Sequence, residues 1–175
     1  EGLRIPPVRL YEAGKLRDDL VDLLALNTRN ERDFRGDLAA MIGAAHLGER
    51  RIVKLLDDFG SEIVLNAIED YFDAAERRTR AIISEWKDGV FEGEAFLDDD
   101  GHGRENIRIH ARVTKAGSDI EVDLTGSDPQ STSFMNSSYA NSQSACAMSL
   151  AFLIDPDVPK NDGAFRPLSV KLKEG

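Results

Sequence analysis

The stretch "ENIRIHARVTKAGSDIEVDLT", residues 105–125, alternates apolar and polar side chains in two successive runs. The first run carries apolar residues at every second position: Ile107, Ile109, Ala111 and Val113. The second run repeats this with Ile120, Val122 and Leu124. A period of two residues is typical of a strand that buries one face. The loop "KAGSD", residues 115–119, has hairpin length, so the sequence predicts two antiparallel strands here.

Further elements are predicted on either side of this hairpin. "VFEGEAFL", residues 90–97, predicts a preceding strand, and "RPLSVKL", residues 166–172, predicts a final one. Residues 138–154 predict a helix between them. A sheet that is apolar on one face needs a second layer, and this helix can supply it.

Before residue 87 the apolar residues recur at helical spacing. Residues 15–28 predict a short helix, and a long periodic run from residue 31 ends at Gly60. Ser61 is a candidate N-cap for a third helix that extends to Trp86. Two long helices joined at "DDFGSE" predict an antiparallel helical hairpin.

We therefore predict an α+β fold, in which a long helical hairpin is followed by a mainly antiparallel sheet with a packed helix. The predicted parts are an extended arm, residues 1–14, a helical subdomain, residues 15–88, and a sheet-and-helix subdomain, residues 89–175. The arm is expected to be extended because Pro6 and Pro7 fix φ and disfavour a helix at the residue before them.

Composition narrows the class of protein. Of 175 residues, 41% are hydrophobic and 31% are charged, as in ordinary globular proteins. A net charge of −10 argues against a nucleic-acid partner, because the phosphate backbone would be repelled. The single cysteine, Cys146, excludes an internal disulfide framework and a multi-thiolate zinc site. No apolar run is long enough for a membrane span, so we expect a cytoplasmic protein.

Small and polar residues crowd the stretch "DLTGSDPQSTSFMNSSYANSQSACA", residues 123–147. Its beginning predicts a loop after a strand. Two interpretations of the rest remain open. The small residues can allow a helix to pack closely on the sheet, or they can form a ligand-facing loop whose free N–H groups hold a carbonyl or carboxylate oxygen.

No catalytic or metal-binding constellation is predicted from the residues themselves. "LDDDGHGRE", residues 97–105, is acidic, but a calcium loop counted from Asp98 would need a glutamate where Ile109 stands. We interpret it as a solvated hairpin loop. His46 is interpreted as a packing histidine. Cys146 is interpreted as a buried small side chain, because no positioned His or basic partner lies nearby in sequence.

Four motifs together resemble one known family. They are "EGLRIPPVRLYEAGKL" (residues 1–16), "RGDLAAMIGAAHLGERR" (residues 35–51), "DLTGSDPQSTSFMN" (residues 123–136) and "PKNDGAFRPLSVKL" (residues 159–172). In this order they are similar to the central part of the B subunit of hydantoinase/oxoprolinase enzymes, a family that also holds subunits of acetone and acetophenone carboxylases. The resemblance spans essentially the whole chain.

The resemblance implies a role in an ATP-dependent enzyme. An A-type partner subunit would hold ATP, and the pair would open a small cyclic amide, as hydantoinases and 5-oxoprolinases do. Two alternatives stay open: the ketone carboxylase branch of the family, and a binding or assembly module without chemistry. The partners implied are the A-type subunit and the remainder of the B subunit, in an oligomer.

The family's B subunits are longer than 175 residues, and their divalent metal is bound by an Asp- and His-rich segment that precedes the first motif. The resemblance therefore implies that this chain binds no metal and is inactive alone. Polar members of the matched motifs are the candidate site residues. Ser127, Gln130 and Asn136 are expected to bind substrate, and Arg4, Arg35 and Asp37 are expected to be structural or binding residues, with Arg35 and Asp37 as a possible ion pair.

Overall fold

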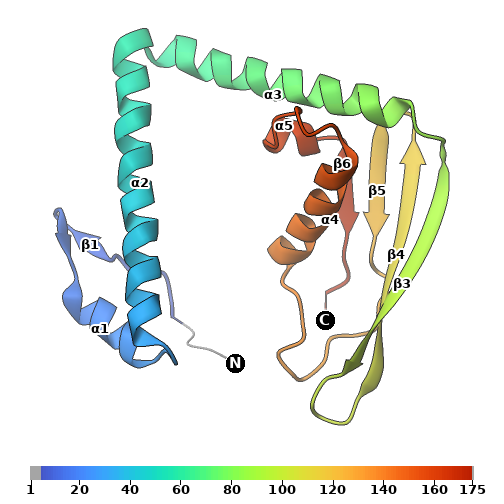
Figure 1. Cartoon of the computed structure of the whole chain (residues 1–175), viewed down its shortest axis with the longest axis horizontal. Coiled ribbons are helices and arrows are strands. Elements are labelled where there is room, and N and C mark those ends of the chain that lie inside the picture. Colours follow the sequence, from blue (N-terminus) through green and yellow to red (C-terminus); the bar gives the residue numbers. More distant parts are fainter. Residues whose placement is uncertain (1–4, 175) are drawn as a thin grey trace. The chain divides into compact units, whose positions relative to one another are not determined.

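The computed structural model describes residues 5–174, and the chain divides into two compact units (Figure 1). One unit ends at Val64 and the other begins at Leu65. The predicted boundaries after residues 14 and 88 rest on changes of element type and stay a prediction.

The first unit opens with a small hairpin. Strand β1 (Tyr11–Glu12) pairs antiparallel with β2 (Lys15–Leu16). Ala13 and Gly14 between them have φ of 49° and 78°, the left-handed conformation that the tightest hairpin turns require. The sequence analysis predicted a helix from residue 15, and this is wrong at its start, because Lys15 and Leu16 form β2 and α1 begins at Asp18. A two-residue strand is too short to show an alternating pattern.

Helices α1 (Asp18–Leu26) and α2 (Glu31–Phe59) complete this unit. Val21 and Ala25 of α1 are buried. The side chain of Asn30 caps α2 by accepting a hydrogen bond from the Asp33 N–H. At the other end Gly60 has φ of 82° and donates its N–H to the Leu56 carbonyl, as expected for a glycine that ends a helix.

Helix α3 (Ser61–Ser84) follows Gly60 directly, so the two predicted long helices are both present. Their antiparallel packing stays a prediction. Within the described chain, no helix is long and apolar enough to cross a lipid bilayer.

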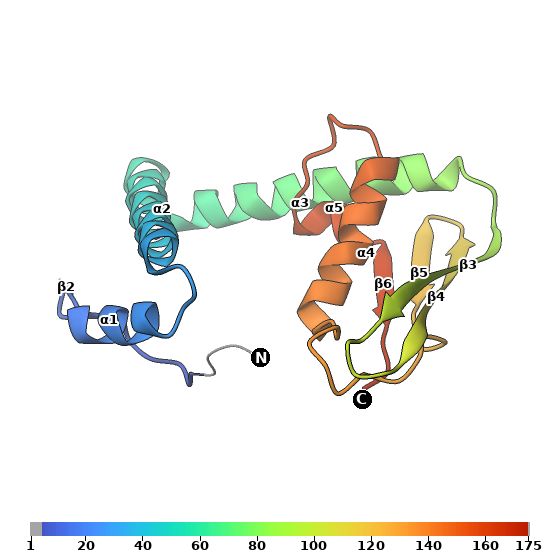
Figure 2. The same cartoon turned by 60° about the horizontal axis from the view of Figure 1, so that its bottom comes forward.

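The second unit contains a four-stranded sheet in the order β3-β4-β5-β6. Strands β3 (Gly89–Asp99), β4 (Glu105–Ala116) and β5 (Asp119–Asp123) form an antiparallel meander. After β5 the chain passes through α4 (Tyr139–Leu153) and α5 (Asp162–Phe165) before β6 (Leu168–Lys171) pairs parallel with β5 (Figure 2). The α+β class and the mainly antiparallel sheet with its helix are confirmed.

The core of this unit lies between the sheet and its helices. It joins residues of α3, β5 and α4 with the connection to β6: Ala75, Ile83, Ile120, Leu150, Ile154, Val158 and Ala164. The turn from α3 to β3 is secured by Lys115 of β4, whose side chain is buried. Its Nζ donates to the Trp86 carbonyl at 2.6 Å and to Asp88 Oδ1 at 2.7 Å. The helix end and the sheet are thereby fixed to each other.

Candidate functional site

The polar loop between β5 and α4 runs beside β4. The Ser127 hydroxyl accepts a hydrogen bond from the His110 N–H at 3.0 Å and donates to the His110 carbonyl at 3.2 Å. Asp128 N–H donates to the Arg108 carbonyl at 2.9 Å, and the Arg108 N–H donates to the Asp128 carboxylate at 3.0 Å. Beyond the end of β5, the loop therefore forms the hydrogen bonds that the backbone N–H and carbonyl groups of β4 would otherwise lack.

Gly126 allows the loop to pass close to His110. A Cβ at position 126 would lie 2.5 Å from His110 Nδ1, well inside van der Waals contact. The Arg108 guanidinium donates to the Gly126 carbonyl at 2.9 Å. A side chain at position 126 would push the loop away from β4.

Asp100 joins this loop to the β3–β4 turn. Its side chain is buried and accepts hydrogen bonds from the Ser131 hydroxyl at 2.6 Å and the His102 and Arg104 N–H groups at 2.8 and 3.1 Å. These donors, the Ser131 hydroxyl first, lower the pKa of Asp100 from 3.8 to about 2. The segment predicted to be a solvated hairpin loop does form a hairpin turn. Its third aspartate, Asp100, is buried and hydrogen-bonded instead of solvated.

Asn136 closes the loop on itself. Its Oδ1 accepts from the Ser131 N–H at 2.8 Å, and its Nδ2 donates to the carbonyls of Ser131 and Ser133 at 2.7 and 3.0 Å. All polar atoms of the amide are engaged, so the side chain shapes the loop before α4 begins.

The first turn of α4 is polar and exposed. The Ser138 side chain caps the helix by accepting from the Asn141 N–H at 3.2 Å. Ser144 and Ala145 are exposed, whereas Cys146 and Ala147 are half-buried, and burial raises the pKa of the Cys146 thiol. Small residues thus occur on both the packed and the open sides of α4.

The predicted substrate-binding residues differ in what they contact. Ser127 and Asn136 are engaged by the protein's own backbone. Gln130 is exposed, and no hydrogen bond of its amide is found among the described residues. Of the three, Gln130 therefore has the amide that is open to a ligand.

The predicted structural residues lie in the first unit. Arg35 donates to Asp22 of α1 and to Glu31, each at 2.8 Å, and so ties α1 to α2. These carboxylates, Glu31 first, raise the pKa of Arg35. Asp37 is exposed on α2, and the carboxylates that pair with Arg35 among the described residues do not include it. Arg4 lies outside the described residues.

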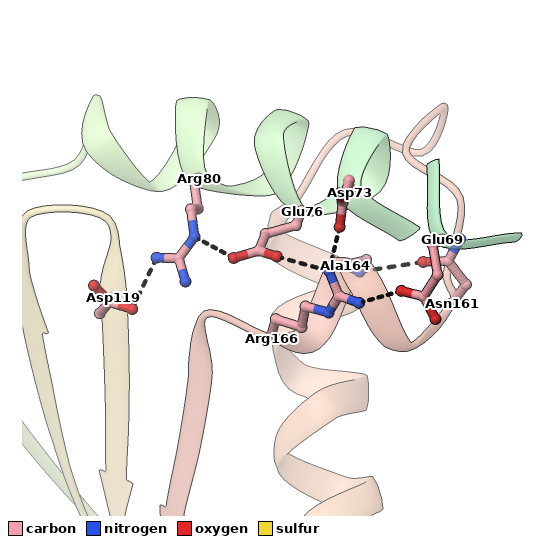
Figure 3. A network of polar contacts seen from close by, with 8 residues as sticks. All are labelled: Glu69, Asp73, Glu76, Arg80, Asp119, Asn161, Ala164 and Arg166. Atoms are coloured by element: carbon pink, nitrogen blue, oxygen red, sulfur yellow. Dashed lines mark hydrogen bonds and ion pairs between the residues drawn. The ribbon is translucent and has the colours of Figure 1, made fainter. Parts of the chain in front are cut away.

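The sequence analysis missed a polar network around Arg166 (Figure 3). The guanidinium of Arg166 pairs with three carboxylates along α3, at 2.6 Å with Asp73, 3.1 Å with Glu76 and 3.3 Å with Glu69. Glu76 also pairs with Arg80, which reaches Asp119 of β5 at 2.8 Å. The helical spacing of these acids was visible in the sequence, but their partner lies about 90 residues away.

A groove of about 320 Å³ lies at the end of the sheet where β4, β5 and β6 meet, lined in part by Asp119, Glu121, Arg166 and Ser169. The predicted site residues do not line it. Across residues 5–174, no group of three or more His, Cys, Asp or Glu side chains is placed to hold a metal ion.

Comparison with known proteins identifies the family of the chain. All of residues 1–175 match the family model described as Hydantoinase B/oxoprolinase, and the chain belongs to this family. It is 40% identical to the beta subunit of the caprolactamase of Pseudomonas jessenii, over 98% of this chain and 29% of that protein.

Other relatives also match nearly the whole of this chain with a part of their own length. Identity is 30% to the B subunit of a putative D-/L-hydantoinase of a Pseudomonas species, over 100% of this chain and 31% of the relative. Identity is 28% to the acetophenone carboxylase delta subunit of Aromatoleum aromaticum, over 98% of this chain and 25% of the relative. The crystal structure of the ATP-dependent caprolactamase from Pseudomonas jessenii superposes with a TM-score of 0.86 at 38% identity, covering 99% of this chain and 30% of that one. The chain thus spans about a third or less of these relatives.

Proposed function

We propose that this chain is part of the B-type subunit of an ATP-dependent enzyme that opens a cyclic amide together with an ATP-binding partner subunit. The observation that carries the proposal is the 40% identity to a caprolactamase beta subunit over 98% of the chain. The amidohydrolase branch is favoured over the ketone carboxylase branch because identity to the acetophenone carboxylase delta subunit is only 28%.

The proposed chemistry explains the need for ATP. A lactam carbon is a poor electrophile because of amide resonance. Transfer of the γ-phosphoryl group of ATP to the lactam oxygen, with release of ADP, would activate this carbon for addition of water. The C–N bond would then break with the amine as the leaving group, and hydrolysis of the resulting acyl phosphate would release phosphate. A subunit that does not bind ATP would contribute by holding the ring in place and by shielding the activated intermediate from bulk solvent. ATP would be bound by the partner, and a divalent metal would be held by residues beyond this chain. A cytoplasmic location is part of this proposal.

Within this chain, the polar loop is the proposed substrate-facing element. Asp100, Ser127 and Asn136 fix its backbone, so that the exposed amide of Gln130 is presented from a supported loop. An amide can donate to a carbonyl oxygen and accept from a ring N–H, which are the two polar groups of a lactam. Ser127 and Asn136 would then act by positioning the loop and not by touching the substrate.

The test uses the longest natural polypeptide that contains these residues, copurified with its ATP-binding subunit. We expect caprolactam, 5-oxoproline or a hydantoin to be converted to the ring-opened acid only with ATP, as measured by mass spectrometry and ADP release. Gln130→Ala should lower kcat/KM at least about tenfold, whereas Thr132→Ala in the same exposed loop should not. Carboxylation of acetophenone with labelled bicarbonate, without ring opening, would refute the hydrolase assignment.

A further inference from the structure

The sheet of the second unit has one face turned toward its helices. Side chains from three strands pack against the core residues of α3 and α4 on this face: Val113, Ile120, Val122 and Leu168. The face is therefore the one that the fold buries.

The same face continues outward onto β3. In the register of β3 and β4, Phe91 pairs with Val113, Gly93 with Ala111 and Ala95 with Ile109. Paired residues in a ladder project to the same side of a sheet, and so do residues two apart on one strand. We define the β3–β4 apolar face as the seven residues of this side that lie between Val113 and the charged pair Asp99–Glu105: Phe91, Gly93, Ala95, Leu97, Ile107, Ile109 and Ala111.

The middle of the β3–β4 apolar face is open, whereas Ile107 at one end of it is only 8% exposed. Phe91 is 53% exposed and Ile109 is 42% exposed. A Cβ added to Gly93, at the centre, would meet no atom within 4 Å. Helix α4 lies beside β6, at the opposite end of the sheet from β3 (Figures 1 and 2). A helix about 10 Å wide covers about two strands spaced about 4.8 Å apart, so α4 cannot also cover β3 and β4.

The reverse side of the same two strands carries charged side chains that form ion pairs. There Arg108 pairs with Glu94 at 3.3 Å, and Arg112 approaches Glu92 at 3.8 Å. The β3–β4 apolar face has no charged member. A contiguous apolar surface beside a charged one is typical of an interaction site, not of a solvated face.

We propose that an apolar segment of the same polypeptide, outside residues 1–175, covers the β3–β4 apolar face. The proposal rests on the proposed function, in which this chain is part of a longer B-type subunit. The solved caprolactamase chain contains the same fold, at a TM-score of 0.86, in only 30% of its length. The open strip is about one helix wide, and an uncharged surface calls for an apolar occupant.

The outer side of α4 also exposes apolar side chains, as expected if a further segment covers this unit. Phe152 is 82% exposed and Met148 is 58% exposed, although Leu150 on the inner side is buried. Large apolar side chains that are exposed together near the end of a helix are typical of a surface that another part of a protein covers. Two surfaces of the unit therefore lack a cover, and a polypeptide that continues beyond this unit can supply both.

A photo-crosslinking experiment tests the proposal. p-Benzoylphenylalanine is placed at Phe91 or at Phe96 in the longest natural polypeptide, copurified with its ATP-binding subunit. Phe96 is the matched control, because it lies on the same strand, points to the charged side and is also 53% exposed. A mixture of 15N-labelled and unlabelled protein separates links within one molecule from links between molecules.

The expected result is a high-yield link from position 91 to a peptide of the same molecule outside residues 1–175, with at least about fivefold lower yield from position 96. A link to a second copy, a link to the ATP-binding subunit, or equally low yields from both positions would overturn the proposal. The readout does not need turnover, so loss of lactam ring opening would refute the proposed function and leave this result standing.

A second measurement guards against misplacement of the bulky probe. Phe91→Asp should lower the Tm of the same polypeptide by at least about 5 °C, because a carboxylate would be buried without a partner. Phe96→Asp should change it by less than about 2 °C. Equal shifts for both variants would contradict a covered apolar face.

Discussion

Helices α2 and α3 were both predicted from the same apolar periodicity in the sequence, but their side chains are buried to very different extents. In α2, which has 29 residues, no residue is buried. In α3, which has 24 residues, Thr79 and Ile83 are 0% exposed and Ala75 is 1% exposed. The contrast shows that an amphipathic pattern marks the face that needs a partner but does not say where the partner is.

The partners of α3 come from distant parts of the second unit. The ion pairs of Arg166 attach the segment before β6 to α3, and Arg80 attaches β5. Gly163 of α5 lies directly on the backbone of Phe72. Arg166 also lies over the Phe72 ring, with 5.9 Å between its Cζ and the ring centroid. In α2 the described polar ties are local or reach α1, as those of Arg35 do.

The difference in packing between α2 and α3 can be tested most directly by truncating one isoleucine in each helix. Ile83→Ala should cost about 2–5 kcal/mol in the free energy of unfolding, because it leaves a cavity in the core. Ile52→Ala in α2, where the isoleucine is 49% exposed, should cost less than about 1 kcal/mol. Urea unfolding followed by circular dichroism measures both. Equal losses would mean that α2 is packed as firmly as α3.

Two glycines provide the next test. A Cβ at Gly163 would lie 2.0 Å from the Phe72 carbonyl oxygen, and backbone cannot give way easily, so Gly163→Ala should destabilise the fold by about 1–3 kcal/mol. Gly43 in α2 has nothing within 4 Å of such a Cβ, and Gly43→Ala should stabilise by about 0.5–1 kcal/mol through helix propensity. Opposite signs in thermal or urea unfolding are expected. A loss at Gly43 would reveal a close neighbour of α2.

The smallest effect should come from acid titration of the polar loop. The pKa of Asp100 is lowered from 3.8 to about 2, so its carboxylate stabilises the fold above about pH 4. This contribution is lost as the pH falls from about 4 to about 2. Asp100→Asn should lower the Tm at pH 7 and flatten its dependence on pH across that window. Asp98→Asn, at an exposed position of β3, is the control, and the same flattening there would contradict the assignment to Asp100.

Local periodicity was enough to predict most elements. The strands flanking "KAGSD", the helix from residue 139 and the strand at residues 168–171 were predicted within a few residues, because each carries its own pattern. The β1–β2 hairpin was missed because its strands have two residues each. Helix α5, with four residues, was missed for the same reason.

The candidate site was less predictable than the fold. The sequence indicated that Ser127, Gln130 and Asn136 would bind substrate, and this stays a prediction. It could not show that Ser127 and Asn136 bond to backbone, because the choice between backbone and ligand depends on how the loop folds against β4. Asp100 and Ser131, which form the central contact of the loop, are separated by 31 residues and carry no joint signal.

The parallel pairing of β5 with β6 has a consequence for the order of events during synthesis. Strands β3, β4 and β5 are joined by short turns and can pair as soon as they leave the ribosome. The edge of β5 must wait for residues 168–171, which follow only after α4 and α5 have been made. Until then the nascent sheet has two unpaired edges, and this is the interval in which it is most exposed to pairing with a wrong neighbour.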